Sequence, residues 1–285
     1  MGKYVILAES GGDVPKEMAE KYGIYIIPMH VNFGDETKDD GFFPTTDIFD
    51  YYKNTGKLPK TAACNSYEFE EMYEKIHAEH PDSHILYLAY SAVTTSTYQS
   101  GLVAMDDRDY ITPFDTKFCS AGQAYVILLM ARYIEEHPDA SVEEIIAYGE
   151  DIRPRTHMGF FPGDLDYLRA GGRVSNAAYM GAKILSLNPL IEINDGYLVA
   201  SKKYRGKMNK VSKKLLQEYV VEHHFSKELL FLIHSPGFPE KQKEELTQMA
   251  TDLGFQEIHW ICTGSVVSTH SGPGAFGLVG LTEKS

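Results

Sequence analysis

KYVILAESGGDVPKEMAEKYGIYIIPMHV, residues Lys3–Val31, is the stretch that decides the fold. It begins with a short apolar run that ends at the turn signal SGGDVP, as a buried strand does. A helix is expected next, because Pro15 suits a first helical position and Gly23 is a common stop signal. Ile24–Val31 is rich in β-branched and aromatic residues and predicts a second strand. The stretch therefore predicts a strand, a helix and a strand in succession.

The alternation of strands and helices continues through the first half of the chain. Further strands are predicted at His84–Tyr90 and Asp109–Asp115, and amphipathic helices begin near Thr46 and Ser66, which are suitable N-caps. A longer apolar helix is predicted over Ser120–His137. Strands that alternate with helices favour a mostly parallel sheet covered on both faces. Ligands of such sheets bind beyond the carboxyl ends of the strands, where three polar turns are predicted: Ser10–Asp13, Ser91–Ser96 and Asp115–Ser120.

The character of the sequence changes near Ile152–Arg155. Beyond this point two strands meet at NDG, residues Asn194–Gly196, which is a strong signal for an antiparallel hairpin. We therefore expect an α/β fold of two domains. Residues 1–153 would form a domain around a mostly parallel sheet, and residues 154–285 a smaller α/β domain with an antiparallel component.

Composition and charge exclude several classes of protein. The 285 residues include 27 Lys and Arg against 40 Asp and Glu, a net charge of −13, so nucleic acid is not an expected partner. No signal peptide is expected, and the apolar tract Ala124–Ile134 is too short for an integral membrane segment. The three cysteines, Cys64, Cys119 and Cys262, have no metal-binding spacing. Reduced thiols and no metal site are therefore expected, in a cytoplasmic protein.

Thr269–Gly277, THSGPGAFG, contains the G-x-G-x-x-G spacing of a dinucleotide-binding turn. Eight residues follow Gly277, too few for the helix and the acidic residue that such a site needs, so dinucleotide binding is not expected. The stretch instead places His270 on a glycine-rich turn. There the ring either donates a hydrogen bond to a ligand carboxylate or contacts water, and the residues alone favour neither. Cys64 is likewise either a thiolate or a buried apolar residue.

Several motifs, in one order, resemble the DegV family. DLDYLRAGGRVS (Asp164–Ser175), followed by ILSLNPLIEINDGYL (Ile184–Leu198), is similar to the D-L-x-Y-L-x-x-G-G-R-[IV]-S and N-P-x-[IL] region of that family. STYQS (Ser96–Ser100) and FDTKFCSAGQ (Phe114–Gln123) resemble two of its turns, and THSGPG its T-H-x-G-P-G element. The resemblance extends over essentially the whole chain, and the combination is specific although each piece alone is not.

The resemblance implies a two-domain DegV-like fold with a long-chain fatty acid between the domains. It also implies a carrier without turnover of its own, and no cofactor apart from the bound fatty acid. The carrier would present the carboxylate to a separate ATP-dependent fatty acid kinase, which forms an acyl phosphate for phospholipid synthesis. The sequence contains no phosphate-binding loop and no catalytic triad pattern, which agrees with that role.

The resemblance also assigns roles to single residues. It places the ligand carboxylate at Thr61, at His270 and at either Ser91 or Thr95. The sequence departs from the family at Ala62–Asn65 and Ala92, where Ser, Gln and Pro are usual, so the head-group turns are altered. Other roles fall to turns near the ligand and to arginines for kinase docking or phosphotransfer: Ser10, Gly272 and Gly274, and Arg173 and Arg205.

Two other functions stay open. The first is a small-molecule hydrolase or transferase that uses His270 with a hydroxyl or with Cys64. The second is a regulatory protein that binds another small amphiphile. The apolar wall of a lipid site has no sequence signal of its own, and Met158–Phe161 and Ala178–Leu185 serve equally well as wall or as ordinary core.

Overall fold

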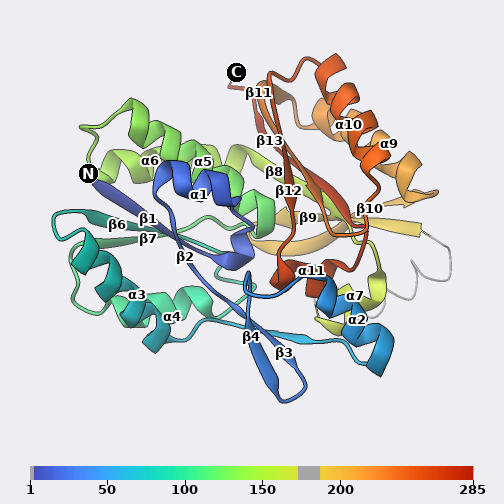
Figure 1. The fold of residues 1–285 in the computed structure, drawn as a ribbon. Helices are drawn as coiled ribbons and strands as arrows, with labels where there is room; N and C mark the ends of the chain where they lie inside the picture. The colour runs from blue at the N-terminus through green and yellow to red at the C-terminus, as the bar shows by residue number, and fades with distance from the viewer. Residues whose placement is uncertain (1–2, 173–186, 285) are drawn as a thin grey trace.

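The computed structural model describes residues 3–172 and 187–284 (Figure 1). Its first part contains β1 (Tyr4–Glu9), η1 (Ser10–Gly12), α1 (Lys16–Tyr22), β2 (Tyr25–Ile27), β3 (His30–Phe33), β4 (Glu36–Asp39), α2 (Thr46–Thr55), β5 (Lys60–Ala62), α3 (Ser66–Glu79), β6 (His84–Ala89), α4 (Thr97–Met105), β7 (Ile111–Asp115), α5 (Ser120–Glu136) and α6 (Val142–Ile152). The second part contains η2 (Arg153–Arg155), β8 (Thr156–Phe161), α7 (Leu165–Ala170), β9 (Leu187–Asn194), β10 (Tyr197–Arg205), α9 (Met208–Glu222), β11 (Phe225–His234), α10 (Glu240–Asp252), β12 (Glu257–Cys262), α11 (Ser265–Ser271) and β13 (Phe276–Thr282). Within these ranges, no helix is both long enough and apolar enough to cross a bilayer.

The first half forms a parallel four-stranded sheet in the order β2-β1-β6-β7. Successive side chains of β1 point to opposite faces, as the period of a strand requires. Ile6 and Ala8 pack with α1, α5 and α6, whereas Val5 and Leu7 pack with α3 and α4. Helices therefore cover both faces of the sheet (Figure 1), which confirms the prediction of a buried parallel sheet.

The second half forms a six-stranded sheet in the order β10-β9-β8-β13-β11-β12. Every neighbouring pair is antiparallel except β11 and β12. The predicted hairpin at NDG is confirmed: β9 and β10 pair across Asp195 and Gly196, whose φ angles of 47° and 86° are those of a tight primed turn. Helices α9 and α10 pack on one face of this sheet.

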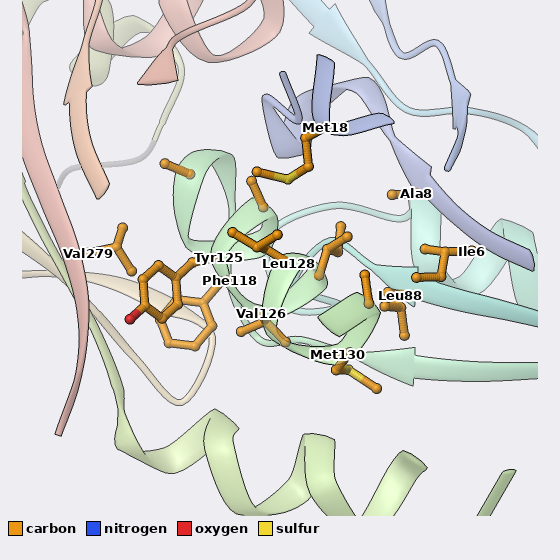
Figure 2. Packing of buried hydrophobic residues seen from close by; sticks show 14 of the residues in the cluster. Ile6, Ala8, Met18, Leu88, Phe118, Tyr125, Val126, Leu128, Met130 and Val279 are labelled. Carbon is orange, nitrogen blue, oxygen red and sulfur yellow. The ribbon is translucent and has the colours of Figure 1, made fainter. Parts of the chain in front are cut away.

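The other face of the six-stranded sheet packs on α5, which also packs on the four-stranded sheet. In Figure 2, Tyr125 and Val279 lie on one side of α5, while Ile6, Ala8 and Leu88 lie beyond its other side. The Tyr125 ring packs 5.1 Å from that of Phe231, measured between centroids. Both sheets thus share one hydrophobic core, and the division at residue 153 stays a prediction.

The prediction of one strand over Ile24–Val31 is wrong. Strand β2 ends at Ile27, because Pro28 has no N–H to continue the ladder of hydrogen bonds. β3 then leaves the parallel sheet and pairs with β4 and β5 in a separate antiparallel sheet of three strands. Of these two partners, β4 lies before α2 and β5 lies between α2 and α3.

Both predicted N-caps are wrong by one residue. Helix α2 has Thr45 at its N-cap, without a side-chain capping bond. Helix α3 has Asn65, whose Oδ1 accepts a hydrogen bond from the Glu68 N–H at 3.1 Å, while the Glu68 carboxylate accepts one from the Asn65 N–H at 2.7 Å. Asn caps a helix as well as Ser does, so the reciprocal pair selects Asn65 over its neighbour.

His30 joins the three-stranded sheet to α3. Its Nδ1 lies 2.8 Å from Asp39 Oδ1 and its Nε2 lies 3.0 Å from Glu68 Oε1. Burial alone would lower the pKa of His30, but the hydrogen bonds and charges of the two carboxylates outweigh burial and raise this pKa above its usual value. The folded protein therefore favours the protonated ring.

We predict that the His30 contribution to stability is present below about pH 6.5, the unfolded-state pKa, and is lost as the pH rises through the higher folded-state pKa. The loss should not exceed about 1 kcal/mol, because both carboxylates are partly exposed. Urea unfolding of the protein and of His30→Gln at pH 6 and pH 9 measures this loss of unfolding free energy. The variant should lose less stability than the parent between these pH values, and an equal loss would contradict this account.

Candidate functional site

A cavity of about 320 Å³ lies where the two larger sheets meet. Its wall includes residues that follow β2, β6 and β7 and residues of β5, the C-terminal sheet and α11. The polar side chains in the wall are Thr61, Tyr90, Thr94, Thr95, Ser96, Ser120, Thr263, His270 and Ser271. The apolar ones are Met29, Ala62, Ala63, Cys119, Met158, Phe160, Leu168, Leu198, Ile233, Val266, Val267, Ala275 and Phe276. The volume falls in the range of ~300–1,000 Å³ that is typical of small-molecule sites.

The wall combines a large apolar surface with hydroxyl groups and one imidazole. Among the described residues that line it, none is Asp, Glu, Lys or Arg, and His270 is the sole basic side chain. Such a wall suits a ligand with a long apolar body. One polar or anionic end of that ligand could be met by the hydroxyls and the ring, which donate hydrogen bonds without a permanent cation.

Thr61 and His270 are brought together, although 208 residues separate them in the sequence. His270 Nε2 lies 2.9 Å from Thr61 Oγ1, within hydrogen-bond distance. Thr61 is on β5 of the three-stranded sheet, where it pairs with Val31, and His270 is on α11 in the second half of the chain. The pair therefore joins the two halves of the chain at the cavity.

The expectation that His270 lies on a turn is wrong, because it occupies the last turn of helix α11. Two carboxylates from the first half hold the other end of this helix. Asp13 Oδ1 accepts a hydrogen bond from the Gly264 N–H at 2.7 Å, and Asp40 Oδ1 accepts one from the Ser265 N–H at 2.7 Å. Carboxylates stabilise the N-terminal end of a helix, so these distant residues stabilise a helix that the local sequence does not predict.

Burial raises the pKa of the Asp13 carboxyl well above its usual range, and the nearby Asp40 raises it further. The hydrogen bonds from Ser120 and Gly264 oppose this shift by stabilising the charged form. Ser120 donates to Asp13 Oδ2 at 2.5 Å and also lines the cavity. The same carboxylate therefore connects α11 to the start of α5.

A buried carboxylate also anchors the turn after β6. Glu9, at the carboxyl end of β1, accepts hydrogen bonds from the Tyr90 N–H at 2.9 Å and from Gln123 Nε2 at 2.8 Å. The Tyr87 hydroxyl donates to it as well. Burial raises the pKa of Glu9, although these three hydrogen bonds favour its charged form. The network ties β1, β6 and α5 together directly beneath the turn that reaches the cavity.

Thr95 lines the cavity, whereas Ser91 is buried behind the wall. The Thr95 hydroxyl lies 2.8 Å from that of Thr97. Ser91 Oγ donates a hydrogen bond to the carbonyl of Gly196 at 2.9 Å, and Lys117 forms an ion pair with Asp195 in the same hairpin. Ser91 thus holds the tip of the β9–β10 hairpin, and of the two candidates Thr95 is the one whose position suits a ligand.

Of the other predicted residues, Ser10, Gly272, Gly274 and Arg205 do not line the cavity. Ser10 Oγ accepts a hydrogen bond from the Met29 N–H at 3.0 Å. Gly272 and Gly274 bend the chain between α11 and β13, with φ angles of 70° and 74°. Arg205 is exposed at the end of β10, and Arg173 lies outside the described residues.

Cys64 does not have the environment of a nucleophile. Its side chain is buried, and its thiol donates to the carbonyl of Pro28 at 3.2 Å. Burial raises the pKa of this thiol, and the charge of Glu9 raises it further, so the thiolate is disfavoured. Residues 3–172 and 187–284 also contain no cluster of three His, Cys, Asp or Glu side chains placed to hold a metal ion.

Sequence reasoning missed most of the apolar wall. Leu198, Ile233 and Phe276 come from three strands of the C-terminal sheet, and their alternation looks like that of any core strand. Of the candidate segment Met158–Phe161, Met158 and Phe160 line the cavity. Ala178–Leu185 lies outside the described residues. No local signal separates a cavity wall from a core, because both are made of the same side chains.

Comparison with known proteins gives one family. The sequence model of the DegV family, described as uncharacterised, matches residues 3–283. Protein DegV of Bacillus subtilis is 26% identical over 283 residues, with 96% of this chain and 97% of that one covered.

Solved structures agree with this match. A DegV-family protein of Thermus thermophilus, described as binding fatty acid, aligns with a TM-score of 0.87 at 22% identity, over 99% of this chain and 100% of that one. A Thermotoga maritima protein, whose structure is described as revealing a fatty acid binding function, aligns with a TM-score of 0.82 at 26% identity, with the same coverage. These alignments confirm the expected α/β fold, with a parallel N-terminal sheet and a mostly antiparallel C-terminal one.

Proposed function

Because the chain belongs to the DegV family, we propose that it binds a long-chain fatty acid in the cavity between its two larger sheets. The observation that carries the proposal is the His270–Thr61 pair at the wall of a largely apolar cavity, in which no described lining residue is Asp, Glu, Lys or Arg. Relatives described as fatty acid binding proteins support the choice of ligand. The two regions 1–153 and 154–285 would act as the two sides of this site.

The chemistry of the wall fits both ends of such a ligand. Transfer of the acyl chain out of water stabilises the complex by about 0.8 kcal/mol per buried methylene, before the entropy cost of binding is subtracted. The carboxylate needs hydrogen-bond donors once it leaves water. Thr61, Thr95 and His270 can donate these bonds, and Thr95 takes the place of the serine that is usual in the family.

We further propose that the protein is a carrier and not an enzyme. It would present the fatty acid carboxylate to a separate ATP-dependent kinase, and the acyl phosphate would serve phospholipid synthesis. Arg205, exposed on the edge strand β10, is a candidate for docking that kinase, together with Arg173. The three free cysteines support a reducing, cytoplasmic location.

The first test identifies whatever co-purifies with the protein. Extraction with organic solvent and mass spectrometry should release close to one long-chain fatty acid per protein molecule. Binding of a labelled fatty acid to the delipidated protein should then saturate at one equivalent. A preparation that contains no acyl lipid and also fails to take up the label would refute the proposal.

Substitutions in the wall test the carboxylate assignment. His270→Ala, Thr61→Val and Thr95→Val should each weaken fatty acid binding by about tenfold, since each removes a hydrogen bond to a charged group. Ser91→Ala is the matched control, because its hydroxyl is bonded to Gly196, and it should change the affinity by less than about threefold. Affinities come from fluorescence titration at constant pH. If Ser91→Ala weakens binding and Thr95→Val does not, the two assignments must be exchanged.

Reconstitution with a purified ATP-dependent fatty acid kinase tests the carrier role. Acyl phosphate, trapped as the hydroxamate, should form only when kinase, ATP and the fatty-acid-loaded protein are all present. Arg205→Ala should slow its formation at unchanged fatty acid affinity, and Lys16→Ala, an exposed charge on α1, should not. Fatty acid binding without any stimulation of the kinase would favour the alternative of a regulatory lipid-binding protein.

A further inference from the structure

We propose that Gly171 is a positioning residue for His270: its missing side chain leaves the space in which the imidazole ring is held toward Thr61. Gly171 directly follows α7 and comes from the stretch DLDYLRAGGRVS, far in sequence from both residues of the pair. The expected effect of Gly171 on fatty acid binding rests on the proposed function. The effect of Gly171 on the position of the His270 ring does not depend on any ligand.

The backbone of Gly171 does not require a glycine. Its φ and ψ angles are −72° and −6°, a right-handed conformation that any residue adopts without strain. Its neighbour Gly172 differs, because a φ of 69° favours glycine there for conformational reasons. The absence of a side chain at Gly171 therefore needs another explanation.

The explanation is the close approach of the His270 ring. A Cβ atom built on Gly171 would lie 2.1 Å from Nδ1 and 2.7 Å from Cε1 of that ring. Both distances are far below van der Waals contact, so any side chain at this position would force the imidazole to move. Alanine, the smallest replacement, would already displace it.

The ring has little room to retreat, because α7 and α11 are interlocked through further glycines. The Gly163 N–H donates to the carbonyl of Ser271 at 2.8 Å, and a Cβ on Gly163 would lie 1.9 Å from the carbonyl oxygen of Pro273. A Cβ on Gly272 would lie 3.0 Å from the Asp164 Cβ. These contacts hold the residues before α7 against the end of α11, directly after His270.

On its other side the ring meets Thr61, with Nε2 2.9 Å from Oγ1. The imidazole is thus held between a backbone that approaches one edge and a hydroxyl at the other. A methyl group at residue 171 would have to rotate the ring, and the rotation would break the Nε2 contact. Gly171 and the THSGPG stretch therefore act together on the orientation of one side chain.

A double-mutant cycle of Gly171→Ala and His270→Ala tests this inference. Gly171→Ala alone should weaken binding of a labelled fatty acid by about tenfold, the loss of one hydrogen bond to a charged group. In the His270→Ala background the same change should alter the affinity by less than about twofold, because the ring that it displaces is gone. Equal effects in both backgrounds would overturn the inference.

A second readout needs no ligand. The imidazole ¹H and ¹⁵N resonances of His270, assigned by their absence in His270→Ala, should shift in delipidated Gly171→Ala. They should stay in place in Ser91→Ala, the control variant, whose hydroxyl is bonded to the carbonyl of Gly196 and not to the ring. Unchanged resonances in Gly171→Ala would refute the positioning role even if the fatty acid proposal holds. Shifted resonances in a protein that binds no fatty acid would support the role and refute that proposal instead.

The folding of the Gly171→Ala variant provides a further test. If Gly171→Ala alone does not fold, the double variant with His270→Ala should fold and unfold in urea at close to the midpoint of His270→Ala, because the steric conflict has been removed. Rescue of this kind supports the inference. Failure of the double variant to fold would contradict it, since the conflict would then involve other atoms than the ring.

Discussion

Both large sheets of this protein depend on one helix. From Ser120 to Ala131, every residue of α5 except Leu129 is buried, and its two sides pack on the parallel and the antiparallel sheet. Separation of either sheet from this helix would expose apolar surface to water, at a free-energy cost of about 25 cal/mol for each Å². The shared helix therefore fixes where the two halves meet, and the cavity lies along that junction, beside the first residues of α5.

The buried carboxylates at this junction act as anchors. Glu9 holds the turn that follows β6, while Asp13 and Asp40 hold the N-terminal end of α11. Burial of a charged group is unfavourable unless hydrogen bonds compensate it, and each of these carboxylates accepts at least one from a backbone N–H. The wall of the cavity is thereby fixed, and among the described residues no Asp, Glu, Lys or Arg side chain lines it.

Much of the architecture follows from local patterns. The strand–helix alternation, the hairpin at NDG and the polar turns after β1, β6 and β7 were predictable, because strand periodicity and turn chemistry act over a few residues. The split of Ile24–Val31 and the helical state of His270 were not. Strand β3 depends on partners from β4 and β5, and α11 depends on Asp13 and Asp40, which no local pattern connects to it.

The sequence by itself determined the α/β class, the family resemblance and the residue types from which a carboxylate site could be built. Tertiary structure alone decided which of them meet. It placed Thr95 at the wall and turned Ser91 toward Gly196, and it brought Gly171 against the ring of His270. The physical reason is that hydrogen bonds and steric contacts act over a few ångströms in space, and the chain positions that come so close are set by packing rather than by sequence separation.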